Sequence, residues 1–274
     1  MRTRGAVVSR TVAQESTAAE SAPDRRRLAV WAGVSYIALF ALAIFANFGV
    51  RERLVDQSDP AATFTNLAGS QQTVRYAIVA FIVIFLLDVF VAWALYHVFR
   101  PAGAALSALT AWFRIVYTVF LGVAVVFLYT VLGLVSESGD MLSLSQSSRE
   151  AGTMLALDAF NVTWLIGLVA FGIHLILIGA MILRSQMAHR ALGAVLAVAG
   201  SAYIFDTAAY TLVENYSANA DVFTAIVAVP AVIAEAAFTI WLLTRAGRNT
   251  AGNDRRLALR WREAHNALTL PPSV

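Results

Sequence analysis

Five ionisable side chains stand within long apolar stretches of this sequence, and they are the residues best suited to do chemistry. They are Asp88, Arg114, His174, Asp206 and Glu235. A charge at the centre of a membrane helix costs at least about 2.5–3.5 kcal/mol on insertion scales, so each of them needs a partner or a function. Acids, an imidazole and a fixed cation together can relay protons, hold an anionic headgroup or supply a general acid, which makes all five candidate catalytic residues.

Several other chemistries are excluded by what the chain lacks. It has no cysteine, and of its four histidines only His174 is far from a loop or tail. A multi-histidine metal site and a bis-histidine haem therefore have too few ligands, so we expect no metal and no cofactor. No HExxH, GxSxG or GxxxxGK[ST] pattern occurs. The arginines are dispersed rather than gathered with aromatic residues, which argues against binding of nucleic acid.

The elements that must position these residues are membrane helices. The chain is 59% hydrophobic and 14% charged, whereas soluble proteins are about 45–50% apolar and about 25% charged. A membrane span needs about 20 apolar residues. Six stretches qualify, at about 28–50, 74–99, 105–135, 154–183, 191–213 and 222–244.

The predicted fold class is therefore all-α, a polytopic bundle of six transmembrane helices. We expect a transmembrane domain over residues 28–245. A disordered cytoplasmic tail over 1–27 should precede it, and a basic cytoplasmic tail over 246–274 should follow it.

The distribution of arginine predicts the orientation. Fifteen arginines lie in the two tails and in the turns at Arg100 and at Arg184 to Arg190, while four lie in the opposite loops. Because positive charge stays on the cytoplasmic side, both termini are expected there. All 20 basic residues are arginine, as in GC-rich bacterial genomes, so the expected location is a bacterial inner membrane.

Spacing predicts that four of the five ionisable groups share one layer. Asp88 lies eleven residues from Phe99, and the other three lie nine residues from the cytoplasmic ends of their spans. At about 1.5 Å per residue all four are roughly 14–16 Å from the inner boundary, where they could line a polar cavity. Asp206 lies nearer the outside, on one helical face with Tyr203, Thr207, Tyr210 and Glu214.

Structural roles are open alternatives for the same residues. Asp88 and Arg114 can form a buried pair that orients two helices, or Arg114 can snorkel to the interface if its helix enters the hydrocarbon near residue 111. His174 can be a hydrogen-bonded packing residue. Asp158 and Arg75 both lie near the outer face and are placed to pair with each other.

Small residues predict a close helix contact. They are Gly172 and Gly179 in the fourth span and Gly193, Ala197 and Gly200 in the fifth. Such residues let helix backbones approach each other in lipid, so we interpret them as packing.

The chain also resembles bacterial membrane proteins of the domain-of-unknown-function family 4386. The most specific stretch runs from Phe171-Gly172-Ile173-His174-Leu175 to Asp206, although Ala188-His189-Arg190 replaces a proline expected before Leu192-Gly193. The other matching segments are residues 59–63 with Asn66, Arg75, Leu95-Tyr96, Arg100-Pro101 and Phe113-Arg114. The resemblance implies the fold and a place for Arg75, Arg114, His174 and Asp206 in the family pattern. It implies no activity.

Three kinds of function are compatible with these observations. The first is a non-enzymatic accessory, sensor or lipid-binding protein with membrane lipid or a lipid-like small molecule as partner. The second is a membrane enzyme acting on a lipid or isoprenoid, with Glu235 or Asp206 as general acid. The third is a proton-coupled carrier of a small solute, for which six spans would need a homodimer.

Overall fold

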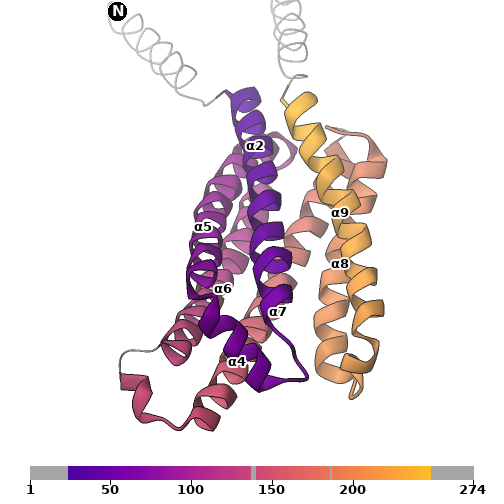
Figure 1. Ribbon diagram of the computed structural model, residues 1–274. Coiled ribbons are helices and arrows are strands. Elements are labelled where there is room, and N and C mark those ends of the chain that lie inside the picture. The colour runs from indigo at the N-terminus through magenta and orange to yellow at the C-terminus, as the bar shows by residue number, and fades with distance from the viewer. Residues whose placement is uncertain (1–23, 137–139, 186, 248–274) are drawn as a thin grey trace, which may run out of the picture.

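The computed structural model describes residues 24–136, 140–185 and 187–247, and its regular structure in these ranges is helical (Figure 1). Six helices are long and apolar enough to cross a membrane, as predicted. They are α2 (Arg25–Ile44) with its continuation to Leu54, α5 (Gln71–Phe99), α6 (Ala104–Val135), α7 (Gln146–Ser185), α8 (Arg190–Leu212) and α9 (Ala220–Thr244). The expected tails lie almost wholly outside the described residues.

The two described ends of the chain lie at the same end of the bundle (Figure 1). We call this the terminal end, where residues 24 and 247 lie, and the opposite one the distal end. The first helix starts at the terminal end, earlier than predicted, because Asp24 caps it: the carboxylate accepts the N–H of Arg26 at 2.9 Å.

The first span ends in an unusual way. After Ile44 the helix continues as the π-helical segment η1 (Phe45–Arg51) and then as α3 (Glu52–Leu54). π-Helical segments are rare and often occur at functional sites.

The connection between the first two spans contains a further short helix. It is α4 (Pro60–Gly69), and Asp59 caps it by accepting the N–H of Ala62 at 2.9 Å. Pro60 stands at the first helical position, where its missing N–H costs nothing. An Asp N-cap followed by Pro is a known sequence signal for the start of a helix, so α4 could have been predicted from Asp59-Pro60.

The predicted small-residue contact joins α7 to α8. A Cβ atom added to Gly172 would lie 2.5 Å from the carbonyl oxygen of Gly200, and one added to Gly179 would lie 2.5 Å from that of Gly193. The two backbones therefore touch at two places, which only glycine permits.

The first and last spans meet only toward the terminal end. There the Arg26 guanidinium donates to the carbonyl oxygens of Leu242 at 3.0 Å and Ala246 at 3.1 Å, and also to that of Leu243. Toward the distal end the first buried residue of α9 is Ala231, eleven residues into the helix. The distal part of α9 is thus only partly covered, by contacts such as those of Phe223 with Phe205 of α8 and with Tyr216.

One expected ion pair does not form. Arg75 on α5 and Asp158 on α7 are both exposed, and neither makes an ion pair within the described residues. Exposed groups gain little from pairing, so nothing compels the two side chains to meet.

Substitution of Gly172 by valine should destabilise the bundle, because the new side chain meets the Gly200 carbonyl. Overpacking of this kind costs about 1–3 kcal/mol. Gly133→Val is the matched control, since a Cβ there meets nothing within 4 Å. Thermal unfolding in detergent should show a lower midpoint for Gly172→Val alone, and equal midpoints would contradict the packing described.

Candidate functional site

The centre of the site is Arg114 on α6, and this residue is 1% exposed. Its Nε donates to Oδ1 of Asp88 on α5 at 3.0 Å, and its Nη2 forms an ion pair with the same oxygen. The side chain is therefore directed into the bundle and does not snorkel to an interface. Asp88, at 2% exposure, neutralises it at direct contact.

Two further partners use the other terminal nitrogen of the guanidinium. Nη1 donates to the Tyr36 hydroxyl at 2.6 Å and lies 3.3 Å from Nε2 of His174. Nδ1 of His174 is 2.9 Å from the carbonyl oxygen of Thr110, which can only accept. His174 therefore donates through Nδ1 and accepts through Nε2, which is the neutral imidazole tautomer.

Aromatic rings cover the remaining surface of the guanidinium. Its central carbon lies 4.9 Å from the ring centroid of Tyr36 and 5.4 Å from that of Phe171. Cation–π contacts of this kind are strongest where water is absent. Arg114 is thus held by four helices, α2, α5, α6 and α7.

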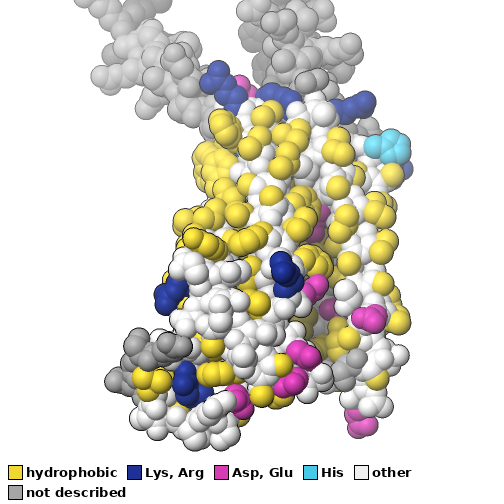
Figure 2. Space-filling view, in the orientation of Figure 1, with side chains coloured by type: hydrophobic (Ala, Val, Ile, Leu, Met, Phe, Trp, Pro, Cys, Tyr) yellow, Lys and Arg dark blue, Asp and Glu magenta, His cyan; other side chains and the backbone are white. Residues whose placement is uncertain are grey.

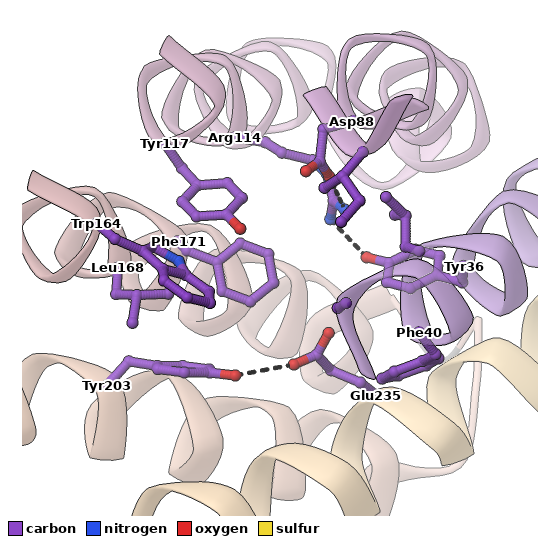
Figure 3. Close-up of a pocket in the computed structure, with 13 residues that line it drawn as sticks. Tyr36, Phe40, Asp88, Arg114, Tyr117, Trp164, Leu168, Phe171, Tyr203 and Glu235 are labelled. Carbon is purple, nitrogen blue, oxygen red and sulfur yellow. Dashed lines mark hydrogen bonds and ion pairs between the residues drawn. The ribbon is translucent and has the colours of Figure 1, made fainter. Parts of the chain in front are cut away.

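Glu235, the fourth residue predicted in this layer, lies across a cavity from Arg114 (Figure 3). Its Oε1 accepts a hydrogen bond from the Tyr203 hydroxyl at 3.1 Å. Arg114 acts on it electrostatically, but no direct bond joins the two. The structure therefore brings Asp88, Arg114 and His174 into contact and sets Glu235 opposite them.

The cavity has a volume of about 210 Å³ and is open rather than enclosed. All six spans contribute to its wall. The lining residues are Tyr36, Leu39, Phe40 and Ala43 of α2, Ile84 and Asp88 of α5, Arg114 and Tyr117 of α6, Trp164, Leu168 and Phe171 of α7, Tyr203 of α8 and Glu235 of α9.

Two polar groups at the cavity have hydrogen-bonding capacity to spare. The indole Nε1 of Trp164 is buried and makes no hydrogen bond of normal geometry in the described chain, although the Tyr117 hydroxyl lies close enough to interact with it. The Glu235 carboxylate receives a single hydrogen bond from the described residues, that of Tyr203. An unsatisfied buried donor costs about 1–3 kcal/mol, so these groups call for a ligand or water.

Asp206 is separate from this cavity. It is 9% exposed, and its Oδ1 accepts a hydrogen bond from the Tyr216 hydroxyl at 2.8 Å. Tyr216 lies beyond the end of α8, in η4 (Tyr216–Asn219). Burial and the hydrogen bond to Asp206 raise the pKa of Tyr216 above its usual value of 10, so the phenol stays protonated as the donor. Asp206 therefore connects α8 to the segment that follows it and does not line the cavity.

Aromatic residues with polar tips are the part of the site that sequence reasoning missed. Tyr36, Tyr117 and Trp164 were counted as apolar span residues, and Tyr203 was assigned to the face of Asp206. Buried Tyr and Trp usually direct their O–H or N–H at a partner, which is the signal that could have found them. Within the described ranges, no three His, Asp or Glu side chains gather as a metal site requires.

Asp88→Asn should destabilise the protein strongly, because it leaves the Arg114 charge buried and uncompensated. Breaking one half of a buried pair costs about 3–5 kcal/mol, whereas replacing both halves by apolar residues is often neutral. Unfolding in detergent should therefore rank Asp88→Asn well below Asp88→Leu combined with Arg114→Met. Asp158→Asn, exposed on α7, is the control and should match the unmodified protein. A mild effect of Asp88→Asn would contradict the pairing.

Comparison with known proteins gives a family and no activity. The model of the domain of unknown function DUF4386 matches residues 31–246. An uncharacterised protein of Archaeoglobus fulgidus is 33% identical over 131 residues, which are 48% of this chain and 65% of that protein. No solved structure matches significantly. Because the family match covers most of the chain, including every residue that lines the cavity, the protein belongs to the DUF4386 family.

Proposed function

We propose that the protein binds an amphipathic, lipid-like molecule in the central cavity. The observation that carries the proposal is that two residues with unused hydrogen-bonding capacity, Glu235 and Trp164, line a cavity whose wall is otherwise largely apolar. A few placed polar groups in an apolar pocket are typical of small-molecule sites. The ligand's polar group would bind a carboxylate on one side and an N–H on the other.

The size of the cavity supports a ligand that is only partly enclosed. Pockets that bury a whole drug-sized molecule measure roughly 300–1,000 Å³, and this one measures about 210 Å³. It suits a polar head and a short length of chain. The rest of the molecule would extend out of the bundle.

The gap between α2 and α9 is where the apolar chain of the ligand would leave the cavity. These helices are joined at the terminal end, while no residue of α9 before Ala231 is buried. Figure 2 shows this face hollowed between the two helices, with an acidic side chain visible inside. An apolar chain leaving here would enter the hydrocarbon of the membrane directly.

The arginine distribution supports an orientation for this binding protein. Fifteen of the 20 arginines belong to the terminal end or its tails, which favours a cytoplasmic terminal end in a bacterial inner membrane. The cavity would then lie in the inner half of the bilayer.

Glu235→Gln and Trp164→Phe should each reduce the amount of lipid that copurifies with the protein, because each removes one polar contact to the head. Loss of one hydrogen bond to a charged group corresponds to roughly 10- to 100-fold weaker binding. Native mass spectrometry of protein in mild detergent measures the retained lipid. The control is Glu214→Gln, which changes an exposed carboxylate beyond the end of α8. Equal retention in all three variants would contradict the proposal.

An enzyme acting on the same class of molecule is the second candidate. It is favoured by the Glu235 carboxyl, which faces the cavity with Tyr203 as its hydrogen-bond donor, as a general acid could. Lipid extracts of cells that express the protein should then contain a product that is absent with Glu235→Gln, at equal protein abundance. Lipid that binds but is recovered unchanged would favour the binding protein.

A further inference from the structure

A second polar pocket lies beside the distal part of the first span. It has a volume of about 240 Å³ and is lined by Asn47, Arg51, Glu52, Val55, Gln57, Leu157 and Asn161. None of these residues lines the central cavity. The pocket is therefore a separate candidate site, and it does not depend on the function proposed above.

Arg51 at this pocket is bound very differently from Arg114. Its Nη1 donates to Oδ1 of Asn47 at 2.8 Å, and its Nη2 donates to Oδ1 of Asn161. Its central carbon lies 4.8 Å from the ring centroid of Phe160 and 5.9 Å from that of Trp164. All of these partners are uncharged.

The positive charge of Arg51 has no carboxylate in direct contact. Glu52 lines the same pocket and acts on Arg51 electrostatically, but its side chain is exposed and no ion pair of Arg51 occurs within the described residues. The Nε of Arg51 is buried and has no hydrogen-bond acceptor within the described residues. A guanidinium held this way retains both charge and donors for a bidentate anion.

The π-helical segment places the site. Asn47 and Arg51 both belong to η1 (Phe45–Arg51), and the Asn47 amide donates to the carbonyl oxygen of Ala43 at 3.1 Å. That bond leaves the amide oxygen of Asn47 free to accept from Arg51. The local helix distortion thus orients the guanidinium toward α7, where Asn161 lies.

From these contacts we infer that the pocket around Arg51 binds an oxyanion of the phosphate class, with Arg51 as the charged ligand and Asn47 and Asn161 as the residues that position it. Arg51 lies three residues before the end of the first candidate span, and the end of a span is where it meets the headgroup region. The phosphate group is either that of a membrane lipid or free inorganic phosphate. The chemistry of recognition is the same for both sources.

The test measures binding of two probes to full-length protein in dodecyl maltoside. Equilibrium dialysis with radiolabelled inorganic phosphate measures the free anion. Native mass spectrometry with added phosphatidylglycerol, compared with diacylglycerol, measures the phosphate-bearing headgroup. Binding of inorganic phosphate identifies a free anion as a ligand, and preference for phosphatidylglycerol without it identifies a lipid headgroup.

Arg51→Gln should weaken binding of the preferred probe roughly 10- to 100-fold, as expected for loss of a charged hydrogen-bond donor. Arg53→Gln is the matched control, because Arg53 is exposed two residues away, and it should bind like the unmodified protein. Glu52→Gln should tighten binding by removing a nearby negative charge.

Asn161→Asp keeps the test decisive if Arg51→Gln fails to fold. The new carboxylate would take the place of an amide oxygen that already accepts from Arg51, so it should neutralise the guanidinium and preserve the fold while abolishing anion binding. Unchanged binding in Asn161→Asp would overturn the inference. So would a result in which the unmodified protein binds neither probe more tightly than Arg51→Gln does. Weaker binding in Glu52→Gln would also overturn it, because removal of a nearby negative charge cannot weaken an anion site built on Arg51.

Discussion

The structure depends on the burial of one guanidinium in the middle of a membrane bundle. Arg114 cannot lose its charge, and a bare cation at this depth is costly. The bundle meets this constraint with a carboxylate, a phenol and a neutral imidazole, which come from three other helices. Because each partner must face the same point, the rotation of four helices about their axes is fixed together.

This arrangement divides the polar residues of the interior into two groups. In the Arg114 cluster the guanidinium and the imidazole are bonded to neighbouring groups of the bundle, whereas Glu235 accepts one hydrogen bond and Trp164 Nε1 makes none of normal geometry. A buried charge whose donors are bonded stabilises and orients the helices, and a polar group with unused hydrogen-bonding capacity is available to a ligand. The helix contacts also leave a route by which a ligand can reach the cavity. The α7–α8 glycines hold those two helices in close contact, while α9 is joined to α2 near the terminal end.

The length of the spans and the depth of the ionisable residues along them were predictable from the sequence. The contacts that depend on how each helix is rotated about its axis were not. Six spans follow from the number of apolar residues needed to cross a bilayer, and helical rise alone placed four ionisable groups in one layer. Which of them touch depends on helix rotation and tilt, so the separation of Glu235 from Arg114 was not predictable. Tyr36 and Trp164 were missed because an aromatic residue in an apolar span is equally good packing. The π-helical turn before Arg51 has no pattern in the sequence, whereas the cap at Asp59 does.

The central claim is that the cavity between Arg114 and Glu235 holds a ligand whose apolar part leaves between α2 and α9. A cryo-electron microscopy map of the protein in nanodiscs of native lipid tests this most directly, with a bound antibody fragment to increase the size of the particle. The account predicts elongated density that touches Glu235 and Trp164 and continues through the α2–α9 gap, with Arg114 against Asp88. A cavity closed by a shifted α9, or one that holds only isolated water peaks, would contradict it.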